Sequence, residues 1–212
     1  TKSGSLTSIN DGGLRVTPPA ANAGSTSYDY PDPQWKLGVT VMGPQGPDSI
    51  RRVLTFTTPP LDQDLEVTGP IVLELYVSST ATDADFIVKL ADQIPQSPED
   101  QKAGLQPASV NVSKGWMRAS HRQKDEKRST KLRPFYTHNS PQPIIPGEIY
   151  KLDIEVMPCA YVFKTGHRIR LEIANMDSPM TDAIFTHQYL YYKVGTDTIH
   201  HNLKYPSRIH LP

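Results

Sequence analysis

The sequence predicts an all-β protein with the architecture of a jelly-roll β-sandwich. Two observations carry this prediction: apolar and polar residues alternate over six or seven positions in several segments, and the 20 prolines fall between those segments. Alternation gives each strand one apolar face and one wet face. Proline lacks a backbone donor and is confined to turns and sheet edges, so it marks where strands stop.

Three segments show the alternation most clearly. In Ile71–Val77, every second residue is aliphatic. Lys151–Val156 and Arg168–Ile173 repeat the pattern with charged residues at the intervening positions. Eight or more short strands separated by proline-rich turns favour a sandwich or jelly roll. The weaker strand candidates are Val53–Thr57, Phe86–Leu90, Val110–Val112, Tyr189–Val194, Thr198–Leu203 and Arg208–Leu211.

Other segments lack the strand pattern. Residues 17–48 are rich in Pro, Gly, Ser and Asp and are predicted to wrap the surface as an ordered arm. Residues 93–108 are polar, contain three prolines, and are predicted to form a long mobile loop. A short helical turn is the most that residues 121–130 would form. Residues 195–197 are expected to turn the last long hairpin.

The 212 residues fit one large all-β domain. We expect an N-terminal arm over residues 1–50, packed on a sandwich over residues 51–212. The N-terminus has neither the apolar stretch of a signal peptide nor an initiating Met. The chain is therefore expected to be a fragment of a longer protein.

Charge and cysteine content limit the partners. Lys plus Arg number 22 and Asp plus Glu number 22, so the formal net charge is zero. Nucleic-acid binding relies on clustered positive charge, so nucleic acid is not an expected partner. No apolar run approaches the ~20 residues of a transmembrane helix, and a membrane is not expected either. Cys159 is the single cysteine, which excludes an internal disulfide and slightly favours the cytoplasm.

The sequence gives no sign of a catalytic centre of its own. It lacks the Gly-x-Ser-x-Gly elbow that an α/β-hydrolase carries between a strand and a helix. The nearest Gly/Ser stretch, residues 24–28, lies in the proline-rich arm. Seven histidines and many carboxylates allow a triad to assemble in space, but surface and loop histidines explain them more simply. We predict no catalytic residue and no cofactor.

Three acidic residues are weak candidates for a metal site. Asp83 and Asp85 are two residues apart, so they can face the same side of a strand, and Asp92 would complete an oxygen-rich Ca²⁺ site. The alternative is that residues 82–85 cap a turn before the strand.

Four aromatic residues are candidate contacts to a ligand or to another domain. Tyr28, Tyr30 and Trp35 lie in the predicted arm and could form a platform on which a sugar stacks. The alternative is that they pin the arm to the domain. Trp116 is the fourth candidate.

Ordered motifs along the chain resemble one known domain family. Residues 114–122 (KGWMRASHR) resemble the GWLRASHR signature of the X-Pro dipeptidyl-peptidase C-terminal domain, which closes the cocaine esterase-like (CocE/NonD) hydrolases and the α-amino-acid ester hydrolases. Residues 54–61 and 65–70 resemble its LTFTTPPL and LEVTGP stretches. The further matches are residues 28–33 (YDYPDP), 82–86 (TDADF), 146–150 (PGEIY), 160–171 (AYVFKTGHRIRL) and 205–212 (YPSRIHLP).

The resemblance implies a jelly-roll sandwich, similar to galactose-binding-like folds, packed against an α/β-hydrolase domain that holds the Ser–Asp–His triad. No position here matches the triad motifs. The expected partner is the catalytic domain of the same parent protein, and a homo-oligomer is a second candidate. The local chemistry agrees with a scaffold role, because Gly166 permits a tight turn before Arg168. Asp85 is expected to accept turn amides or to pair with Arg168 or Arg170.

Two functions from different classes follow. The first is a non-catalytic accessory domain that supports a serine hydrolase acting on esters, amides or X-Pro peptides, and walls its substrate cleft. The alternative is a stand-alone module that binds carbohydrate or another ligand, which the fold alone does not support.

Overall fold

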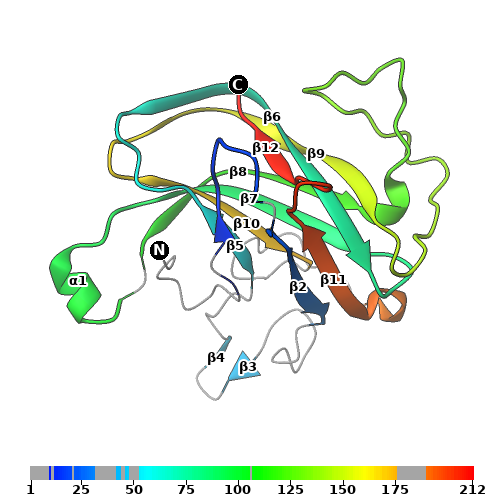
Figure 1. Cartoon of the computed structure of the whole chain (residues 1–212), viewed down its shortest axis with the longest axis horizontal. Coiled ribbons are helices and arrows are strands. Elements are labelled where there is room, and N and C mark those ends of the chain that lie inside the picture. The colour runs from blue at the N-terminus through cyan, green and yellow to red at the C-terminus, as the bar shows by residue number, and fades with distance from the viewer. Residues whose placement is uncertain are drawn as a thin grey trace.

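A computed structural model describes residues 10, 12–20, 22–31, 42–43, 46–47, 53–105, 107–175 and 190–212. These residues form a curled, strand-rich molecule with very little helix, which confirms the predicted all-β sandwich (Figure 1). The helical elements are α1 (Pro98–Lys102) and the 3-10 turns η1 (Ala119–His121) and η2 (Tyr191–Lys193). The strands are β1 (Gly12–Gly13), β2 (Ser25–Tyr30), β3 (Met42–Gly43), β4 (Gly46–Pro47), β5 (Leu54–Thr57), β6 (Leu65–Ser79), β7 (Asp85–Gln93), β8 (Ser109–Arg118), β9 (Tyr150–Phe163), β10 (Arg168–Ala174), β11 (Gly195–His200) and β12 (Arg208–His210).

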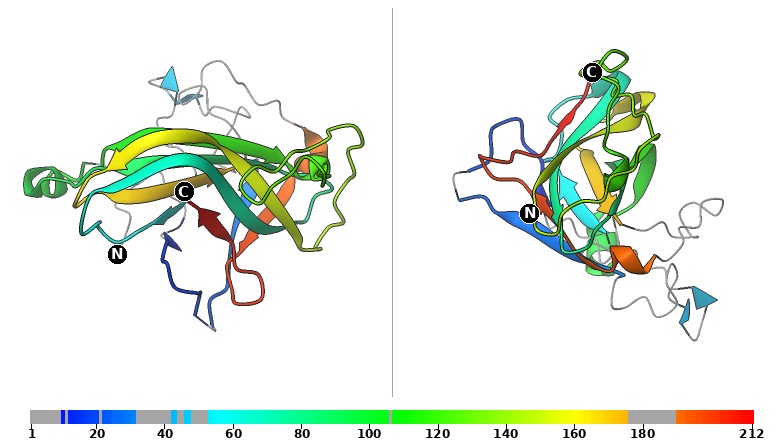
Figure 2. Two further views of the ribbon diagram at one scale, coloured as in Figure 1. Left: turned by 90° about the horizontal axis from the view of Figure 1, so that it is seen from above. Right: turned by 90° about the vertical axis from the view of Figure 1, so that its right-hand side faces the viewer.

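The strands form two layers that are joined at one crossing. They belong to one ten-stranded sheet with the order β1-β5-β10-β7-β8-β9-β6-β11-β2, in which β12 also pairs with β6. The sheet is strongly curled (Figure 2), and we call the part from β1 to β8 one layer and the part from β9 to β2 the other. The layers meet where β8 and β9 share a single residue pair, Gly115 with Val156. A Cβ at Gly115 would lie 2.2 Å from the Glu155 carbonyl oxygen. Only glycine therefore lets the two strands come this close.

The core between the layers is built from the alternating aliphatic residues. The apolar residues of the three clearest predicted strands are at most 4% exposed, which confirms those strands. Phe86, Val88 and Leu90 of β7 join the same core, and β7 lies beside β10 and in the layer opposite β6 and β9. Burial of each such side chain stabilises the fold by roughly 1.5–3 kcal/mol. The core residues of the three strands are Ile71, Leu73, Leu75, Val77, Leu152, Ile154, Val156, Ile169, Leu171 and Ile173.

The prediction for residues 190–197 is wrong, and residue 189, where the predicted strand begins, lies outside the described residues. Tyr191–Lys193 forms the 3-10 turn η2 instead of a strand, and Gly195 and Asp197 lie inside β11 instead of in a hairpin turn. The glycine has a different purpose, because a Cβ at Gly195 would lie 2.4 Å from the Thr80 hydroxyl oxygen. Close approach of two strands and a turn both select glycine, so the sequence alone could not separate them.

The predicted arm and the predicted long loop both contain regular structure. Ser25–Tyr30 is not part of a wrapping arm alone: it forms β2, which pairs with β11 along its whole length. In the loop, β7 continues through Gln93, and Ser97 begins α1 by accepting a hydrogen bond from the Asp100 amide at 3.0 Å. The division at residue 50 stays a prediction, as does the similarity to galactose-binding folds.

The turn at Gly166 is confirmed, with φ +81° between the end of β9 and the start of β10. Because β9 and β10 belong to different layers, this turn carries the chain from one layer to the other. Across the described ranges, no helix has the length and apolar character needed to cross a membrane.

Candidate functional site

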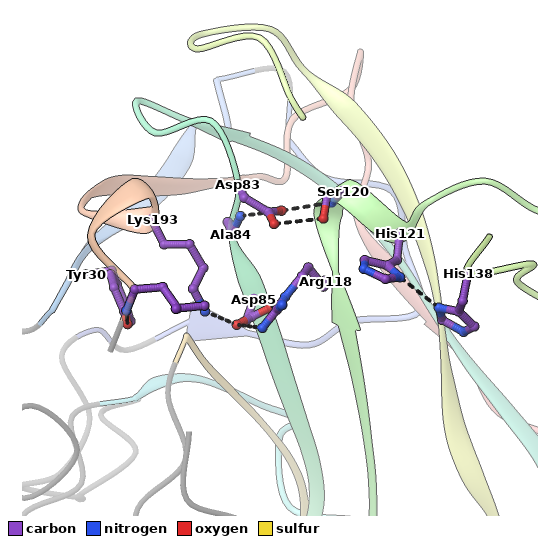
Figure 3. A network of polar contacts seen from close by, with 10 residues as sticks. Tyr30, Asp83, Ala84, Asp85, Arg118, Ser120, His121, His138 and Lys193 are labelled. Atoms are coloured by element: carbon purple, nitrogen blue, oxygen red, sulfur yellow. Dashed lines mark hydrogen bonds and ion pairs between the residues drawn. The ribbon is translucent and has the colours of Figure 1, made fainter. Parts of the chain in front are cut away.

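Three segments that are far apart in the sequence meet at one end of the sandwich (Figure 3). β7 and β8 are antiparallel, with Asp85 opposite Arg118, so the start of β7 and the end of β8 lie at the same edge. The 3-10 turn η2 brings Lys193 to the same place. Two of the motifs that carried the family resemblance, residues 82–86 and 114–122, are therefore in direct contact.

Asp83 joins the two motifs through its carboxylate. The backbone N–H of Ser120 donates to Oδ1 at 2.8 Å, and its hydroxyl donates to Oδ2 at 2.7 Å. The Ala84 amide donates to Oδ1 at 3.0 Å. Asp83 is 6% exposed. Three donors from two segments hold this buried carboxylate in place, so Asp83 acts as a fixed connection between the β6–β7 turn and the end of β8.

Asp85 is the centre of a buried ion-pair network. Arg118 donates to it in bidentate fashion, at 2.8 Å from Nε and 3.2 Å from Nη2. Lys193 donates from Nζ to Oδ2. The Lys193 side chain is 1% exposed, and its Nζ lies 5.3 Å from the centre of the Tyr30 ring. Burial lowers the pKa of Lys193, although Asp85 opposes this, whereas the hydrogen bond to Asp85 raises the pKa of Arg118.

A second buried carboxylate, Asp197, lies at the same end. It is 1% exposed, and Asn175 donates to its Oδ2 at 3.1 Å. Its Oδ1 is buried and has no hydrogen-bond partner among the described residues. Burial raises the pKa of Asp197 to about 6, despite hydrogen bonds from Asn175 and Ser79 that lower it.

Exposed apolar side chains surround this network. Thr82 links two of the segments that carry them, because its hydroxyl donates to the Tyr192 carbonyl at 3.4 Å and its carbonyl accepts from the Ile144 amide at 2.8 Å. Trp116 lies two residues before Arg118 and so faces the same side of β8. We call the set of four the end surface: Trp116 (50% exposed), Ile145 (57%), Tyr191 (80%) and Tyr192 (37%).

The three aspartates of the predicted metal site do not come together. Asp92 lies seven residues along β7 from Asp85, which is about 23 Å in an extended strand. It accepts hydrogen bonds from His167 Nδ1 at 2.9 Å and from the Tyr161 hydroxyl at 2.8 Å. Asp83 and Asp85 are each occupied by protein donors. Within the part of the chain that is described, no group of three or more metal-ligating side chains occurs.

The expected partner of Asp85 was also wrong. Arg170 pairs with Glu172 at 2.8 Å, and Arg168 donates to the Thr58 carbonyl at 2.8 Å. Both arginines belong to β10, whereas the ion-pair partners of Asp85 are Arg118 and Lys193. Lys193 had no signal in the sequence, because a lysine beside two tyrosines is typical of an exposed segment.

The four aromatic candidates fall in three different places. Tyr28 and Tyr30 are 6% and 2% exposed and face the core, so they cannot present their rings to a sugar. They hold β2 on the domain, which was the alternative reading. Trp116 is exposed at the end surface. Trp35 lies outside the described residues.

The described residues hold hydroxyl, imidazole and carboxylate groups, but not as a catalytic triad. Ser78 and Thr26 contact His200 and His201, each at 2.9 Å, and these pairs link neighbouring strands. Among the described histidines, His167 bonds the Asp92 carboxylate at 2.9 Å, and His210 Nε2 lies 3.8 Å from the Glu74 carboxylate. Neither of these imidazoles bonds a hydroxyl among the described residues, as a catalytic triad would require. Tyr161 and His167 both bond Asp92, but there the carboxylate and not the imidazole is in the middle. In the described ranges no imidazole bonds both a hydroxyl and a carboxylate, and the geometry is that of a scaffold.

Comparison with known proteins identifies the scaffold. The family profile of the X-Pro dipeptidyl-peptidase C-terminal non-catalytic domain matches residues 3–210. The cocaine esterase of Rhodococcus sp. is 29% identical over 201 residues, which cover 87% of this chain and 31% of the esterase. The chain thus spans about a third of the length of that relative.

Solved structures agree on the fold. A CocE/NonD family hydrolase from Staphylococcus aureus superposes with a TM-score of 0.72 at 20% identity, covering 96% of this chain and 35% of the hydrolase. An α-amino acid ester hydrolase superposes with a TM-score of 0.62 at 22% identity, covering 95% of this chain and 34% of that one. The chain therefore belongs to the family of X-Pro dipeptidyl-peptidase C-terminal non-catalytic domains.

Proposed function

We propose that this domain supports the catalytic domain of a serine hydrolase by docking through the end surface, and that it walls one side of the substrate cleft. The relatives are named for the hydrolysis of esters, and one for amino acid esters. By analogy, we propose that the parent enzyme cleaves ester or amide bonds, and that the catalytic residues belong to the part of the enzyme outside this chain.

The observation that carries the proposal is the composition of the end surface. Four large apolar side chains are exposed on the segments that meet around the buried charges, and Tyr191 alone is 80% exposed. Contiguous exposed apolar patches with polar rims mark docking sites. Aromatic residues and arginine are also enriched at interface centres, and Arg118 is two residues from Trp116 on β8 and interacts electrostatically with Tyr192.

The network beneath the surface makes it rigid. Lys193 and Arg118 hold Asp85 from η2 and β8, and Ser120 holds Asp83. Side chains that are already fixed lose little conformational freedom on docking, so less of the interaction free energy is spent on ordering them. The two family motifs are therefore explained as the support of an interface.

The test is hydroxyl-radical footprinting of the full-length enzyme, read by mass spectrometry. We expect the Tyr191 and Trp116 rings to be protected, because the catalytic domain covers them. Phe135 is the internal control: it is 37% exposed here and lies in the excursion between β8 and β9, so it should stay reactive.

The same experiment, repeated at several protein concentrations, distinguishes the catalytic domain from a second copy of this chain as the partner that covers the end surface. Protection of Tyr191 that disappears on dilution would assign the end surface to a second copy of the chain. Reactivity of Tyr191 equal to that of Phe135 at all concentrations would contradict docking at this surface altogether.

A further inference from the structure

Two histidines outside the Asp85 network face each other across a loop. His121 ends the 3-10 turn η1, and His138 lies in the long loop over residues 122–149, which connects η1 to β9 and which we call the β8–β9 excursion. Their Nδ1 atoms are 3.1 Å apart and their ring centres 5.2 Å apart (Figure 3). Nothing in the proposed docking function needs this contact, and both residues are partly or fully exposed.

The backbone at His138 is held in an unusual conformation. Its φ of +55° is the only positive φ recorded for a non-glycine residue in the described part of the chain. This left-handed conformation costs roughly 1–2 kcal/mol and persists where the surroundings fix it. A strained residue that presents a functional side chain is a reasonable starting point for a hypothesis of function.

Hydrogen bonds on both sides of His138 hold it opposite His121. The Thr137 amide donates to the Gln123 carbonyl at 3.1 Å, and the Gln142 amide donates to the Ser120 carbonyl at 2.8 Å. Each bond ties the chain next to His138 to the chain next to His121. The two imidazoles are therefore brought together before any ligand arrives.

The separation of the two nitrogens suits a metal ion. With metal–nitrogen distances of about 2.0–2.1 Å, two nitrogens 3.1 Å apart subtend an angle of roughly 100° at the ion, between the octahedral and tetrahedral values. We propose that His121 and His138 bind a divalent transition metal ion through their Nδ1 atoms, with water in the remaining positions. Two imidazoles favour Zn²⁺, Ni²⁺ or Cu²⁺ over Ca²⁺ and Mg²⁺, which prefer oxygen ligands.

Proton movements on binding are simple. In the apo pair one Nδ1 carries the hydrogen that the other accepts, so one ring has its proton on Nδ1. Binding requires both Nδ1 lone pairs, so this proton moves to Nε2 of the same ring and both rings stay neutral. Within the described part of the chain, neither histidine uses a ring nitrogen in any other hydrogen bond.

The basic residue that follows His121 in the sequence, Arg122, is bonded to other partners. Arg122 donates from Nη1 to the Gln142 carbonyl at 2.5 Å, and its guanidinium lies 4.6 Å from the centre of the Tyr150 ring. Among the described side chains, no third ligand joins the pair. The site is thus an open one, and the metal would fasten the β8–β9 excursion to η1.

The test is calorimetric titration of the intact protein with Zn²⁺. We expect one ion to bind per protein, and His138→Asn to weaken binding at least tenfold. Asparagine is a suitable replacement because it tolerates the left-handed backbone and so leaves the loop in place. His121→Asn should have the same effect. His200→Asn is the matched control, since His200 bonds Ser78 and should leave binding unchanged.

A second measurement is the thermal midpoint. Zn²⁺ should raise it in the wild type and in His200→Asn, because a ligand that binds only the folded state stabilises it by mass action. Ca²⁺ should have no effect. The proposal is overturned if His138→Asn binds Zn²⁺ as tightly as the wild type, or if neither protein binds it. Neither outcome bears on docking at the end surface, which footprinting reads separately.

Discussion

Two buried carboxylates, Asp85 and Glu74, have similar partners in very different surroundings. Each accepts from two cationic side chains, Lys193 and Arg118 for Asp85, and Lys151 and Arg208 for Glu74. Their own side chains are equally buried, at 8% exposed. The partners differ: the Lys193 side chain is 1% exposed, whereas those of the two Glu74 partners are 43% and 57% exposed.

The difference shows that the burial of the partner decides what an ion pair does. At Asp85 the carboxylate and the Lys193 ammonium have both left water, so each depends on the other, whereas the third member, Arg118, is 36% exposed. At Glu74 the cations keep most of their hydration and lose little when the carboxylate is removed. The pKa values follow this. Burial lowers the pKa of Lys193. Burial acts to raise the pKa of Glu74, but Lys151 and Arg208 together lower it.

The largest effect is expected for Asp85→Ala. The change leaves the Lys193 ammonium buried without a counter-charge, and breaking a buried pair in this way costs roughly 3–5 kcal/mol. Urea denaturation should show a large fall in the free energy of unfolding, with a slope close to that of the wild type.

The paired replacement sharpens this result. Asp85→Leu combined with Lys193→Met removes both charges, so most of the stability lost in the single variant should return. If the double variant is no more stable than Asp85→Ala, then the cost arises from lost contacts of Asp85 with Arg118 and not from the stranded lysine.

The sequence predicted the core strands of the two layers better than it predicted the Asp85 network at the end of the sandwich. Ile71, Leu152 and Ile169 begin regular alternations, and a one-sided pattern over six residues has few alternatives to a strand. The Asp85 network could not be predicted in the same way. Lys193 comes from a segment more than a hundred residues distant, and its burial depends on how η2 folds over the sheet edge.

The family motifs in the sequence indicated where the Asp85 network lies, but they did not indicate which residues pair with Asp85. Residues 82–86 and 114–122 were recognisable, and antiparallel pairing of β7 and β8 brings them together. The sequence suggested Arg168 or Arg170, both in β10, as the arginine that pairs with Asp85. Arg118, inside the motif itself, is the residue directly opposite in the ladder. His138 lacked any signal, because its conformation is fixed by hydrogen bonds of the loop.

The second carboxylate of the buried end, Asp197, predicts a dependence on pH. Its pKa is about 6 in the folded protein and about 3.9 in the unfolded chain, so the folded state binds the proton more tightly. Stability from this group is therefore present below about pH 4 and lost as the pH rises to about 6. The difference corresponds to roughly 3 kcal/mol.

Asp197→Asn tests this sign. The variant cannot ionise, so it should gain stability over the wild type as the pH is raised from about 4 to about 7. Urea midpoints at a series of pH values measure the gap between the two proteins. A gap that stays constant across this range would show that Asp197 does not titrate as a buried acid.

A smaller effect is expected at the Glu74 end. Glu74→Gln keeps the shape of the side chain and returns two exposed cations to water, so the loss should be about 1 kcal/mol. The loss should shrink in high salt, because the partners are accessible to ions. A loss as large as that of Asp85→Ala would contradict the rule that partner burial sets the cost.

The smallest effect is expected at Asp64, which completes the series because both its own side chain and that of Lys164 are exposed, at 48% and 60%. The hydrogen bond from Lys164, then those from Thr165, lower the pKa of Asp64 to about 2. Its contribution to the free energy of unfolding is therefore present above about pH 4 and lost as the pH falls toward 2.

Asp64→Asn keeps an acceptor for the Thr165 amide and removes only a screened charge. At neutral pH we expect its urea midpoint to equal that of the wild type within error. A clear loss there would mean that an exposed pair can stabilise this fold without buried partners, and the contrast between Asp85 and Glu74 would then need another cause.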